Sequence, residues 1–580
     1  MKVQSLTLSA LLVTILSSPF SSPASATPLA IPADAVRAAE LFSVSDAEIA
    51  NLLTVKNHKG EIVLSAKKHA NHASEIWATK DAVKNGIQGT STDRAYRKHF
   101  LRMLFEREDR PVVVAVIDGG VDISHEDLQG KIWVNEKELN GKPGIDDDGN
   151  GYVDDAYGWN FLGAKDGRNV GEQTLEVTRE YARLKKKKES TGLSPEEQKY
   201  FEAVAIDFNK KKGVSAARAS EFRDMLEKME AALVILRGAG LKEESVPAVL
   251  AIDSKDPAVV AAKDFALKML LDKLSTSYLR RALAYYEAKK DKDAKFYFNT
   301  EFNSSTIVGD DPDNMEETGY GNSDVTGPDA SHGTHVSGII AAIRGNRFGV
   351  KGQAKNVRIM AIRAVPDGDE RDKDVANAIR YAVDNGARII NMSFGKDYSP
   401  NKSTVDSACR YAESRGVLLV HAAGNDGKNT ESGSNNFPNK RTLQLGAEPG
   451  RTLENWIEVG ASGPKRDENL PAEFSNYGKT SVDLFAPGVE IISTTPGNQY
   501  AAYDGTSMAS PEVAGVAALL LSQKGGLEAK SLRAILMETS TKYEGLMVKL
   551  PGSKTETAPF SSLSVAGGIV NAMRALNLVY

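Results

Sequence analysis

Three short segments, far apart in the chain, carry an aspartate, a histidine and a serine in that order. Asp118 follows the apolar run VVVAVI, His332 lies in SHGTHVSG, and Ser507 lies in GTSMASPEVAG. A serine hydroxyl is a weak nucleophile at neutral pH, so it needs a base within hydrogen-bond reach and a third group that fixes the tautomer of that base. These residue types could therefore supply a nucleophile, a general base and an orienting carboxylate.

Each of the three residues stands at the end of a predicted element. The run 112–117 predicts a buried parallel strand with Asp118 at its carboxyl end, where the active sites of open α/β sheets form. The small and apolar residues after His332 predict a helix that packs on this sheet. A second helix is predicted over 508–522, just after the serine, because Pro511 is tolerated in the first turn of a helix. Its N-terminus would favour negative charge near the nucleophile.

The order Asp, His, Ser resembles that of the subtilisin-like serine proteases (subtilases, peptidase family S8). The resemblance covers about residues 93–578. It implies a serine endopeptidase with an acyl-enzyme intermediate, on an α/β fold with a three-layer, doubly wound, mostly parallel sheet. It assigns the base to His332 and leaves His335 as a packing residue. The run GVLLVHAAGND predicts a buried strand that ends in Asn425, and it resembles the subtilisin segment whose asparagine donates to the oxyanion.

The segment IINMSFG, 389–395, resembles the substrate-binding strand of the family, whose backbone would pair with an extended peptide. Asn436 would stand at the base of the specificity pocket, where subtilisins often have glycine, and a side-chain amide there would narrow the pocket. The residues expected to bind substrate are Ser393, Phe394, Gly395, Ala423, Gly424, Asp426 and Asn436.

The segment DDDGNGYVDD has the spacing of a calcium-binding loop, although Tyr157 stands where an EF-hand has its bidentate glutamate. Asp155 or a distant carboxylate must then complete the site. The alternative is a solvated Asp/Gly/Asn turn. A second acidic cluster, Asp310 to Asp313, is either another such site or a loop. The predicted calcium ligands are Asp146, Asp148, Asn150, Tyr152 (through its carbonyl) and Asp154.

The stretch between Asp118 and His332 is far longer than the few dozen residues of simple subtilisins. From 170 to 294 it shows charged, helical periodicity, with a capping box at Ser194–Glu197 and an apolar stripe that begins at Phe222 and stops at Gly238. We expect four or five helices here. Because the chain leaves and re-enters the sheet near the catalytic residues, this insertion either flanks the substrate cleft or is a peripheral decoration.

The N-terminus predicts export. A lysine, a short apolar stretch and the small-residue site Ala24-Ser25-Ala26 resemble a secretory signal peptide that is too short to span a membrane. We therefore expect a secreted or periplasmic protein without a membrane span. The predicted organisation is a signal peptide (1–26), an N-terminal region and candidate propeptide (27–92), a catalytic domain (93–169 and 295–580) and a helical insertion (170–294).

Composition fits a folded enzyme that binds peptides. The 580 residues are 41% hydrophobic and 26% charged, and the formal net charge of −5 lacks the basic excess that nucleic-acid binding needs. The one cysteine, Cys409, allows no internal disulfide and is interpreted as a buried hydrophobe. We expect a monomer whose partners are protein or peptide substrates.

Two functions of another class remain open. A catalytically impaired subtilase would bind peptides without cutting them, and it would show damage at a catalytic position. A calcium-dependent surface-binding protein would need repeated loops or binding modules outside the region of resemblance. The sequence shows none of these features.

Overall fold

The computed structural model describes residues 55–56, 62–64, 76–99, 110–346, 348–431 and 436–580. The chain divides into two units, Met1–Ala70 and Asn71–Tyr580. In the first unit, the strands β1 (Val55–Lys56) and β2 (Ile62–Leu64) pair antiparallel. The predicted signal peptide and most of the candidate propeptide lie outside the described residues.

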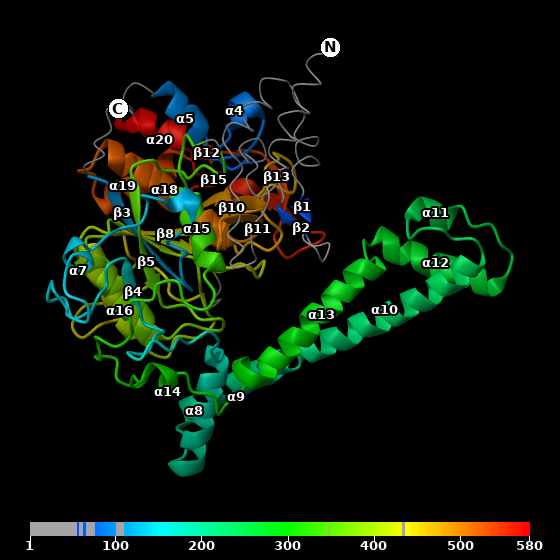
Figure 1. The fold of residues 1–580 in the computed structure, drawn as a ribbon, viewed down its shortest axis with the longest axis horizontal. Helices are drawn as coiled ribbons and strands as arrows, with labels where there is room; N and C mark the ends of the chain where they lie inside the picture. Colours follow the sequence, from blue (N-terminus) through cyan, green and yellow to red (C-terminus); the bar gives the residue numbers. More distant parts are fainter. Residues whose placement is uncertain (1–54, 57–61, 65–75, 100–109, 347, 432–435) are drawn as a thin grey trace, which may run out of the picture. The chain divides into compact units, whose positions relative to one another are not determined.

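The second unit is built on a nine-stranded sheet in the order β12-β15-β9-β8-β7-β6-β3-β5-β4 (Figure 1). Neighbouring strands are parallel except β12 and β15, so the predicted mostly parallel sheet is confirmed. The strands are β3 (Val112–Asp118), β4 (Gly158–Asn160), β5 (Val357–Arg363), β6 (Ile389–Met392), β7 (Leu418–Ala422), β8 (Trp456–Ser462), β9 (Leu484–Pro487), β12 (Thr541–Lys542) and β15 (Gly568–Ile569).

Helices cover both faces of this sheet, because its central strands are apolar on both sides. In β3, Val114 and Val116 contribute to one buried cluster, whereas Ala115 and Ile117 contribute to another. The first cluster includes residues of α15 (Ser331–Ala341), α18 (Thr506–Gln523), α19 (Ala529–Thr539) and α20 (Ala572–Val579). The second includes residues of α16 (Asp372–Asp384) and α17 (Lys402–Ser414). The predicted three-layer fold is therefore confirmed.

The periodicity of 170–294 predicts four or five helices, and the structure has six. The additional helix is the short α11, which has Pro247 as its second residue and is too short for periodicity to reveal. The helices are α8 (Glu176–Ser190), α9 (Pro195–Lys212), α10 (Val214–Gly238), α11 (Val246–Leu250), α12 (Pro257–Leu271) and α13 (Thr276–Lys292), followed by the π-helix η4 (Asp293–Tyr297).

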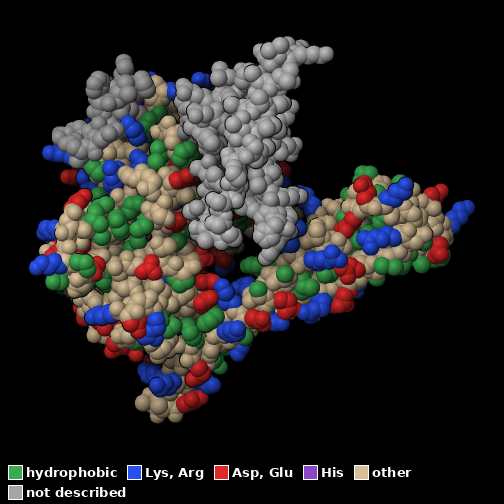
Figure 2. Space-filling model, in the orientation of Figure 1, with side chains coloured by type: hydrophobic (Ala, Val, Ile, Leu, Met, Phe, Trp, Pro, Cys, Tyr) green, Lys and Arg blue, Asp and Glu red, His purple; other side chains and the backbone are tan. Residues whose placement is uncertain are grey.

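These helices form two apolar clusters. The helices α8 and α9 share one that contains Val177, Phe208 and Tyr297. The helices α10, α12 and α13 share another, in which Met229, Leu233 and Leu236 of the predicted stripe are buried. Figure 1 shows α10 and α13 side by side, and Figure 2 shows acidic and basic side chains interspersed over this pair. We call α10 to α13 the helical arm.

Short elements complete the described chain. The hairpins are β10 (Ile491–Thr495) with β11 (Gln499–Tyr503) and β13 (Met547–Lys549) with β14 (Thr557–Pro559). The remaining helices are α4 (Ala82–Asn85), α5 (Thr92–Lys98), η3 (Glu126–Leu128), α7 (Glu136–Leu139), α14 (Ser305–Val308) and η5 (Phe560–Ser562). Cys409 is buried on α17, as predicted. Among the described residues, no helix combines the length and the apolar character that a membrane crossing requires.

Candidate active site

Asp118 and His332 form a hydrogen-bonded pair at the carboxyl end of the sheet. His332 Nδ1 lies 2.9 Å from each carboxylate oxygen of Asp118, and the amide of Gly119 donates to Asp118 Oδ1 at 2.8 Å. Burial opposes protonation of His332, but the charge of Asp118 and its hydrogen bond outweigh burial and raise the pKa of the imidazole above its ordinary value. A carboxylate only accepts hydrogen bonds, so Nδ1 carries the proton and Nε2 is left with a lone pair.

The close approach of α15 to β3 depends on the residue after His332. A Cβ at Gly333 would lie 2.2 Å from the carbonyl oxygen of Gly120 and 3.0 Å from Cβ of Asp118. Only glycine fits at such distances. His335, on the same helix, is buried, lies 3.0 Å from the carbonyl oxygen of Ile491 and stacks on Tyr503, as expected of a packing residue.

Ser507 stands in the first turn of α18, and the helix begins earlier than the sequence predicts. Since α18 starts at Thr506, Pro511 lies in the second turn and not in the first. Proline removes the amide that would bind the Ser507 carbonyl, and the hydroxyl of Ser393 donates to that carbonyl instead, at 2.9 Å. The Ser507 hydroxyl donates to the carbonyl oxygen of Ser393 at 3.0 Å, rather than to His332.

Asn425 presents an amide N–H₂ group beside the serine. Its Oδ1 accepts from both the amide and the hydroxyl of Thr506, each at 2.9 Å, which fixes the orientation of the side chain. Its Nδ2 lies 3.7 Å from where a Cβ of Gly505 would be. The strand β7 ends at Ala422, three residues earlier than predicted, and the chain turns at Gly424 (φ 97°) to reach this position. Asn425 Nδ2 and the Ser507 amide are thus available to an oxyanion.

A cleft of about 420 Å³ opens from Ser507. Six of the seven predicted substrate-binding residues line it: Ser393, Phe394, Gly395, Gly424, Asp426 and Asn436. Ala423 is the exception, because it is buried in a cluster with Leu470 and Phe485, whereas Ala422 lines the cleft. Successive residues of an extended chain face opposite sides, so only one of the two alanines can face the cleft.

The side chain of Asn436 is hydrogen-bonded to a buried glutamate, Glu458, which the sequence analysis did not identify. Its Nδ2 donates to the carbonyl oxygen of Ala422 at 3.1 Å and to Glu458 Oε1 at 3.3 Å. Glu458 also contacts His421 Nδ1 at 3.0 Å and accepts from Trp456 Nε1 at 2.8 Å. A glutamate among the apolar residues at the start of strand β8 is the signal that could have identified it.

The structure brings together a different carboxylate set from the predicted calcium loop. Carboxylate oxygens of Glu138, Asp148 and Asp155 lie within 4.8 Å of one another. Asp148 is one of the five predicted loop ligands, whereas Asp155 and the distant Glu138 match the two kinds of carboxylate that were expected to complete the site. Burial, with a further contribution from the charge of Asp148, outweighs the hydrogen bonds that Asp155 accepts and raises the pKa of Asp155 to about 6. Oxygen ligands crowded in this way fit a calcium ion, which would relieve their mutual repulsion.

The other predicted calcium ligands have different contacts. Asp146 accepts hydrogen bonds from the amides of Gly149, Asn150 and Gly151, and Asp154 accepts from the amide of Gly144. Asn150 donates from Nδ2 to Asp155 and accepts at Oδ1 from the amide of Tyr152. Asp146 and Asp154 therefore hold the turn together through backbone amides and do not belong to the group of three carboxylates.

The second acidic cluster surrounds a lysine. The ammonium of Lys373, which is buried, binds Asp310, the carbonyl oxygen of Asp311 at 2.7 Å and Glu317 at 2.9 Å. A loop is therefore better supported here than a second calcium site, because the ammonium of Lys373 already neutralises Asp310 and Glu317.

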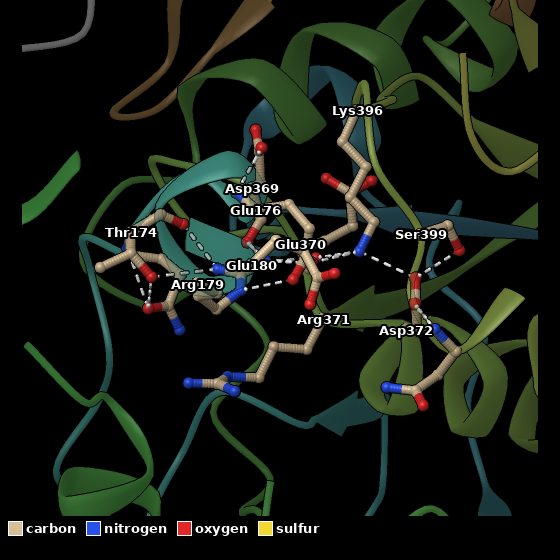
Figure 3. A network of polar contacts seen from close by, with 12 residues as sticks. Thr174, Glu176, Arg179, Glu180, Asp369, Glu370, Arg371, Asp372, Lys396 and Ser399 are labelled. Atoms are coloured by element: carbon tan, nitrogen blue, oxygen red, sulfur yellow. Dashed lines mark hydrogen bonds and ion pairs between the residues drawn. The ribbon is translucent and has the colours of Figure 1, made fainter. Parts of the chain in front are cut away.

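A network of buried charges lies beside the cleft and was also not predicted (Figure 3). Lys396, which follows the substrate strand, lies 2.8 Å from Glu176 of α8 and 2.8 Å from Asp372 of α16. Arg179 of α8 pairs with Glu176 and donates to the carbonyl oxygen of Glu370 at 3.1 Å. The sequence analysis did not identify these residues, because the network joins segments that are far apart in the chain.

An α/β fold with a carboxylate-imidazole pair and a serine at a helix N-terminus has the make-up of a serine hydrolase. Comparison with known families gives the narrower assignment. The model of the subtilase family (Peptidase_S8) matches residues 109–553, and this chain belongs to that family.

Several curated proteins are similar over part of the chain. The thermophilic serine proteinase of Bacillus sp. (strain AK1) is 44% identical over 216 residues, which are 37% of this chain and 48% of that protein. Thermitase of Thermoactinomyces vulgaris is 38% identical over 37% of this chain and 68% of its own length. Subtilisin Savinase of Lederbergia lenta is 37% identical over 36% of this chain and 70% of its own. The chain thus spans about half the length of the first of these relatives.

Proposed function

We propose that this protein is a serine endopeptidase that cleaves peptide bonds through an acyl-enzyme intermediate. The observation that carries the proposal is the convergence of four side chains at the carboxyl end of one sheet: the Asp118–His332 pair, Ser507 at a helix N-terminus and the oriented amide of Asn425. The relatives named serine proteinase, thermitase and subtilisin support it.

The chemistry follows from these groups. Ser507 Oγ attacks the scissile carbonyl carbon while His332 Nε2 takes its proton, and Asn425 Nδ2 with the Ser507 amide binds the oxygen that becomes negative. His332 then gives the proton to the departing amine, which leaves an ester on Ser507. Water hydrolyses the ester by the same proton route in reverse. Asp118 stabilises the imidazolium in both steps.

Substrate binding would also release the nucleophile. The carbonyl oxygen of Ser393 accepts the Ser507 hydroxyl, and it belongs to the strand that a bound peptide would pair with. A peptide N–H that takes this carbonyl displaces the Ser507 hydroxyl toward His332. The serine then becomes a stronger nucleophile when a peptide occupies the cleft.

Peptide hydrolysis tests the proposal. The parent protein should cleave casein and short chromogenic peptides, and Ser507→Ala should lower kcat by about 10⁶-fold, as in subtilisin itself. Ser522→Ala, on the same helix but remote from the cleft, should leave the rate unchanged. Peptide binding without cleavage by the parent would instead indicate a catalytically impaired binding module.

The proposal extends to a structural calcium ion and to export. Glu138, Asp148 and Asp155, with the loop from Asp146 to Asp154 around them, would hold the ion and stiffen the loop. The signal peptide would direct the protein to the periplasm or the medium as a monomer that acts on proteins or peptides and not on nucleic acids. Residues 93–169 and 295–580 would form the catalytic domain, with 170–294 as its insertion.

A further inference from the structure

The backbone of the turn that carries Asn425 is held through its neighbours. No hydrogen bond between residues that the structure describes involves the backbone of Asn425 itself. On one side, the amide of Ala423 donates to the carbonyl oxygen of Val459 at 3.0 Å, and on the other the amide of Gly427 donates to that of Phe474 at 2.7 Å. The position of the side-chain amide of Asn425 therefore depends on how the residues around it are fixed.

One buried side chain, that of Asn476, makes most of the contacts with this turn. Its Oδ1 accepts from the amides of Asp426 at 3.2 Å and Lys428 at 2.9 Å, and its Nδ2 donates to the carbonyl oxygen of Ala423 at 2.9 Å. Its own backbone amide donates to the carbonyl oxygen of Gly424, also at 2.9 Å. These four hydrogen bonds reach residues on both sides of the proposed oxyanion donor.

The turn lies so close to its surroundings that two of its residues must be glycine. Gly424 has a φ of 97°, and a Cβ there would lie 2.5 Å from Asn476 Nδ2. A Cβ on Gly427 would lie 2.7 Å from Cα of Gly552, in the loop of the β13–β14 hairpin. The turn is thus packed against both Asn476 and the hairpin, which leaves it little room to shift.

Removal of the Asn476 side chain would leave two amides and one carbonyl oxygen without their partners. Backbone groups that lose a hydrogen bond inside a protein cost free energy, so the turn would rearrange to recover partners. Asn425 lies between these groups and would move with them. A misplacement of about 1 Å at a catalytic site can lower the rate by about 10²-fold.

We propose that Asn476 is a positioning residue for the oxyanion donor: it holds the turn 423–428 so that Asn425 Nδ2 meets the negative oxygen of the transition state. Asn476 is not among the residues that line the cleft at Ser507, so it acts through Asn425 and not on the substrate. The proposal rests on the peptidase activity proposed above and adds a residue to its machinery.

A double-mutant cycle tests this role. The values of kcat and KM on one chromogenic peptide are measured for the parent, Asn476→Ala, Asn425→Ala and the double variant. Asn476→Ala should lower kcat by about 10–100-fold with little change in KM, because the oxyanion forms only in the transition state. In the Asn425→Ala background, the same substitution should lower kcat less than about threefold, because the group that it positions is already absent.

Asn455→Ala is a matched control at the other end of the strand that leads to this turn. Asn455 is also buried, and its Nδ2 donates to the carbonyl oxygen of Val417 at 2.7 Å, just before β7 begins. This variant also removes a buried asparagine that binds the backbone. We expect Asn455→Ala and Asn476→Ala to lower Tm alike, and only Asn476→Ala to lower kcat.

Three results would overturn the positioning role while the peptidase proposal stands: an unchanged kcat in Asn476→Ala, an equal loss of kcat in both backgrounds, or an equal loss in Asn455→Ala. A parent that neither cleaves the peptide nor reacts with a serine-directed phosphonate would overturn the peptidase proposal itself. Asn476→Asp replaces Asn476→Ala if circular dichroism shows that the alanine variant does not fold. It keeps the acceptor for both amides and loses the donor to Ala423, so it should show a smaller loss of kcat with the same dependence on Asn425.

Discussion

The side-chain amide of Asn425 contacts α18, the helix that carries Ser507, and it also supplies the proposed donor to the oxyanion. Its oxygen holds the first amide of α18, and its nitrogen is left for the substrate. Asn425→Asp keeps the oxygen acceptor but removes the donor, so it should lower kcat by about 10²–10³-fold with little change in KM. Steady-state kinetics on one peptide measures this. A change in KM alone would show that Asn425 binds the ground state and not the oxyanion.

The fall of kcat/KM at low pH should reflect protonation of His332. Asp118 raises the pKa of His332, so the protonated, inactive form persists to a higher pH than for a free imidazole. Activity should therefore rise with pH, with a midpoint in kcat/KM above the ordinary value of 6.5. Asp118→Asn should move this midpoint to lower pH and reduce the rate by about 10⁴-fold. An unmoved midpoint would assign the limb to another group.

At the residue scale, the sequence predicts those site residues whose neighbours along the chain are informative. Asp118, His332, Asn425 and Ser507 each follow a strand or open a helix, so local patterns locate them. Glu458, Glu138 and Lys396 act through contacts between distant segments, and no local pattern marks such contacts. Ala423 was assigned to the cleft because the spacing alone could not say which of two adjacent alanines faces it.

Among the elements, the helical arm has its own core and should tolerate damage without loss of peptide hydrolysis. Met229 on α10 is fully buried within the cluster that α10, α12 and α13 share. Met229→Ala should destabilise the arm by about 2–5 kcal/mol and increase hydrogen exchange in 214–292. Val234→Ala, on the same helix at a position that is 65% exposed, is the control. A parallel loss of short-peptide cleavage would show that the arm supports the cleft.

The segment before α16 should make stability depend on pH. Burial, together with the charges of Asp369 and Asp372, outweighs the opposing charge of Lys396 and raises the pKa of Glu370 to about 8. From the ordinary value of 4.5 up to about 8, the folded protein holds a proton that the unfolded chain has lost, so this group lowers stability as pH rises.

As pH rises from 5 to 8, the Tm of Glu370→Gln should therefore fall less than the Tm of the parent. Melting curves across this range measure the difference, with the exposed Glu316→Gln as control. Equal slopes for the parent and Glu370→Gln would show that Glu370 is ionised throughout.

The elements themselves follow closely from local sequence. The apolar run before Asp118 forms β3, and the capping box at Ser194 opens α9. Strand and helix ends are less predictable: β7 stops before Asn425, and α18 begins before the predicted first turn because Ser393 compensates for Pro511. Ser393 is distant from α18 in the sequence and reaches the Ser507 carbonyl only in the folded protein, so local sequence does not reveal this hydrogen bond.

For the molecule as a whole, calcium should raise stability if the carboxylate cluster binds it. A ligand present at 100 times its Kd stabilises the folded state by about 2.7 kcal/mol. We expect calcium to raise Tm and chelation to lower it, and Glu138→Gln to abolish the response. Asp154→Asn tests the alternative ligand set, since Asp154 contacts the amide of Gly144. A calcium response that survives in Glu138→Gln but not in Asp154→Asn would favour the loop spacing over the cluster.

Covalent labelling tests whether Ser507 is a nucleophile that His332 activates. A serine-directed phosphonate should modify the parent at one site, and peptide mass spectrometry should locate that site at Ser507. Ser507→Ala should not be labelled, and His332→Ala should be labelled far more slowly. Labelling that persists in Ser507→Ala, or a parent that stays unlabelled with calcium present, would contradict the account.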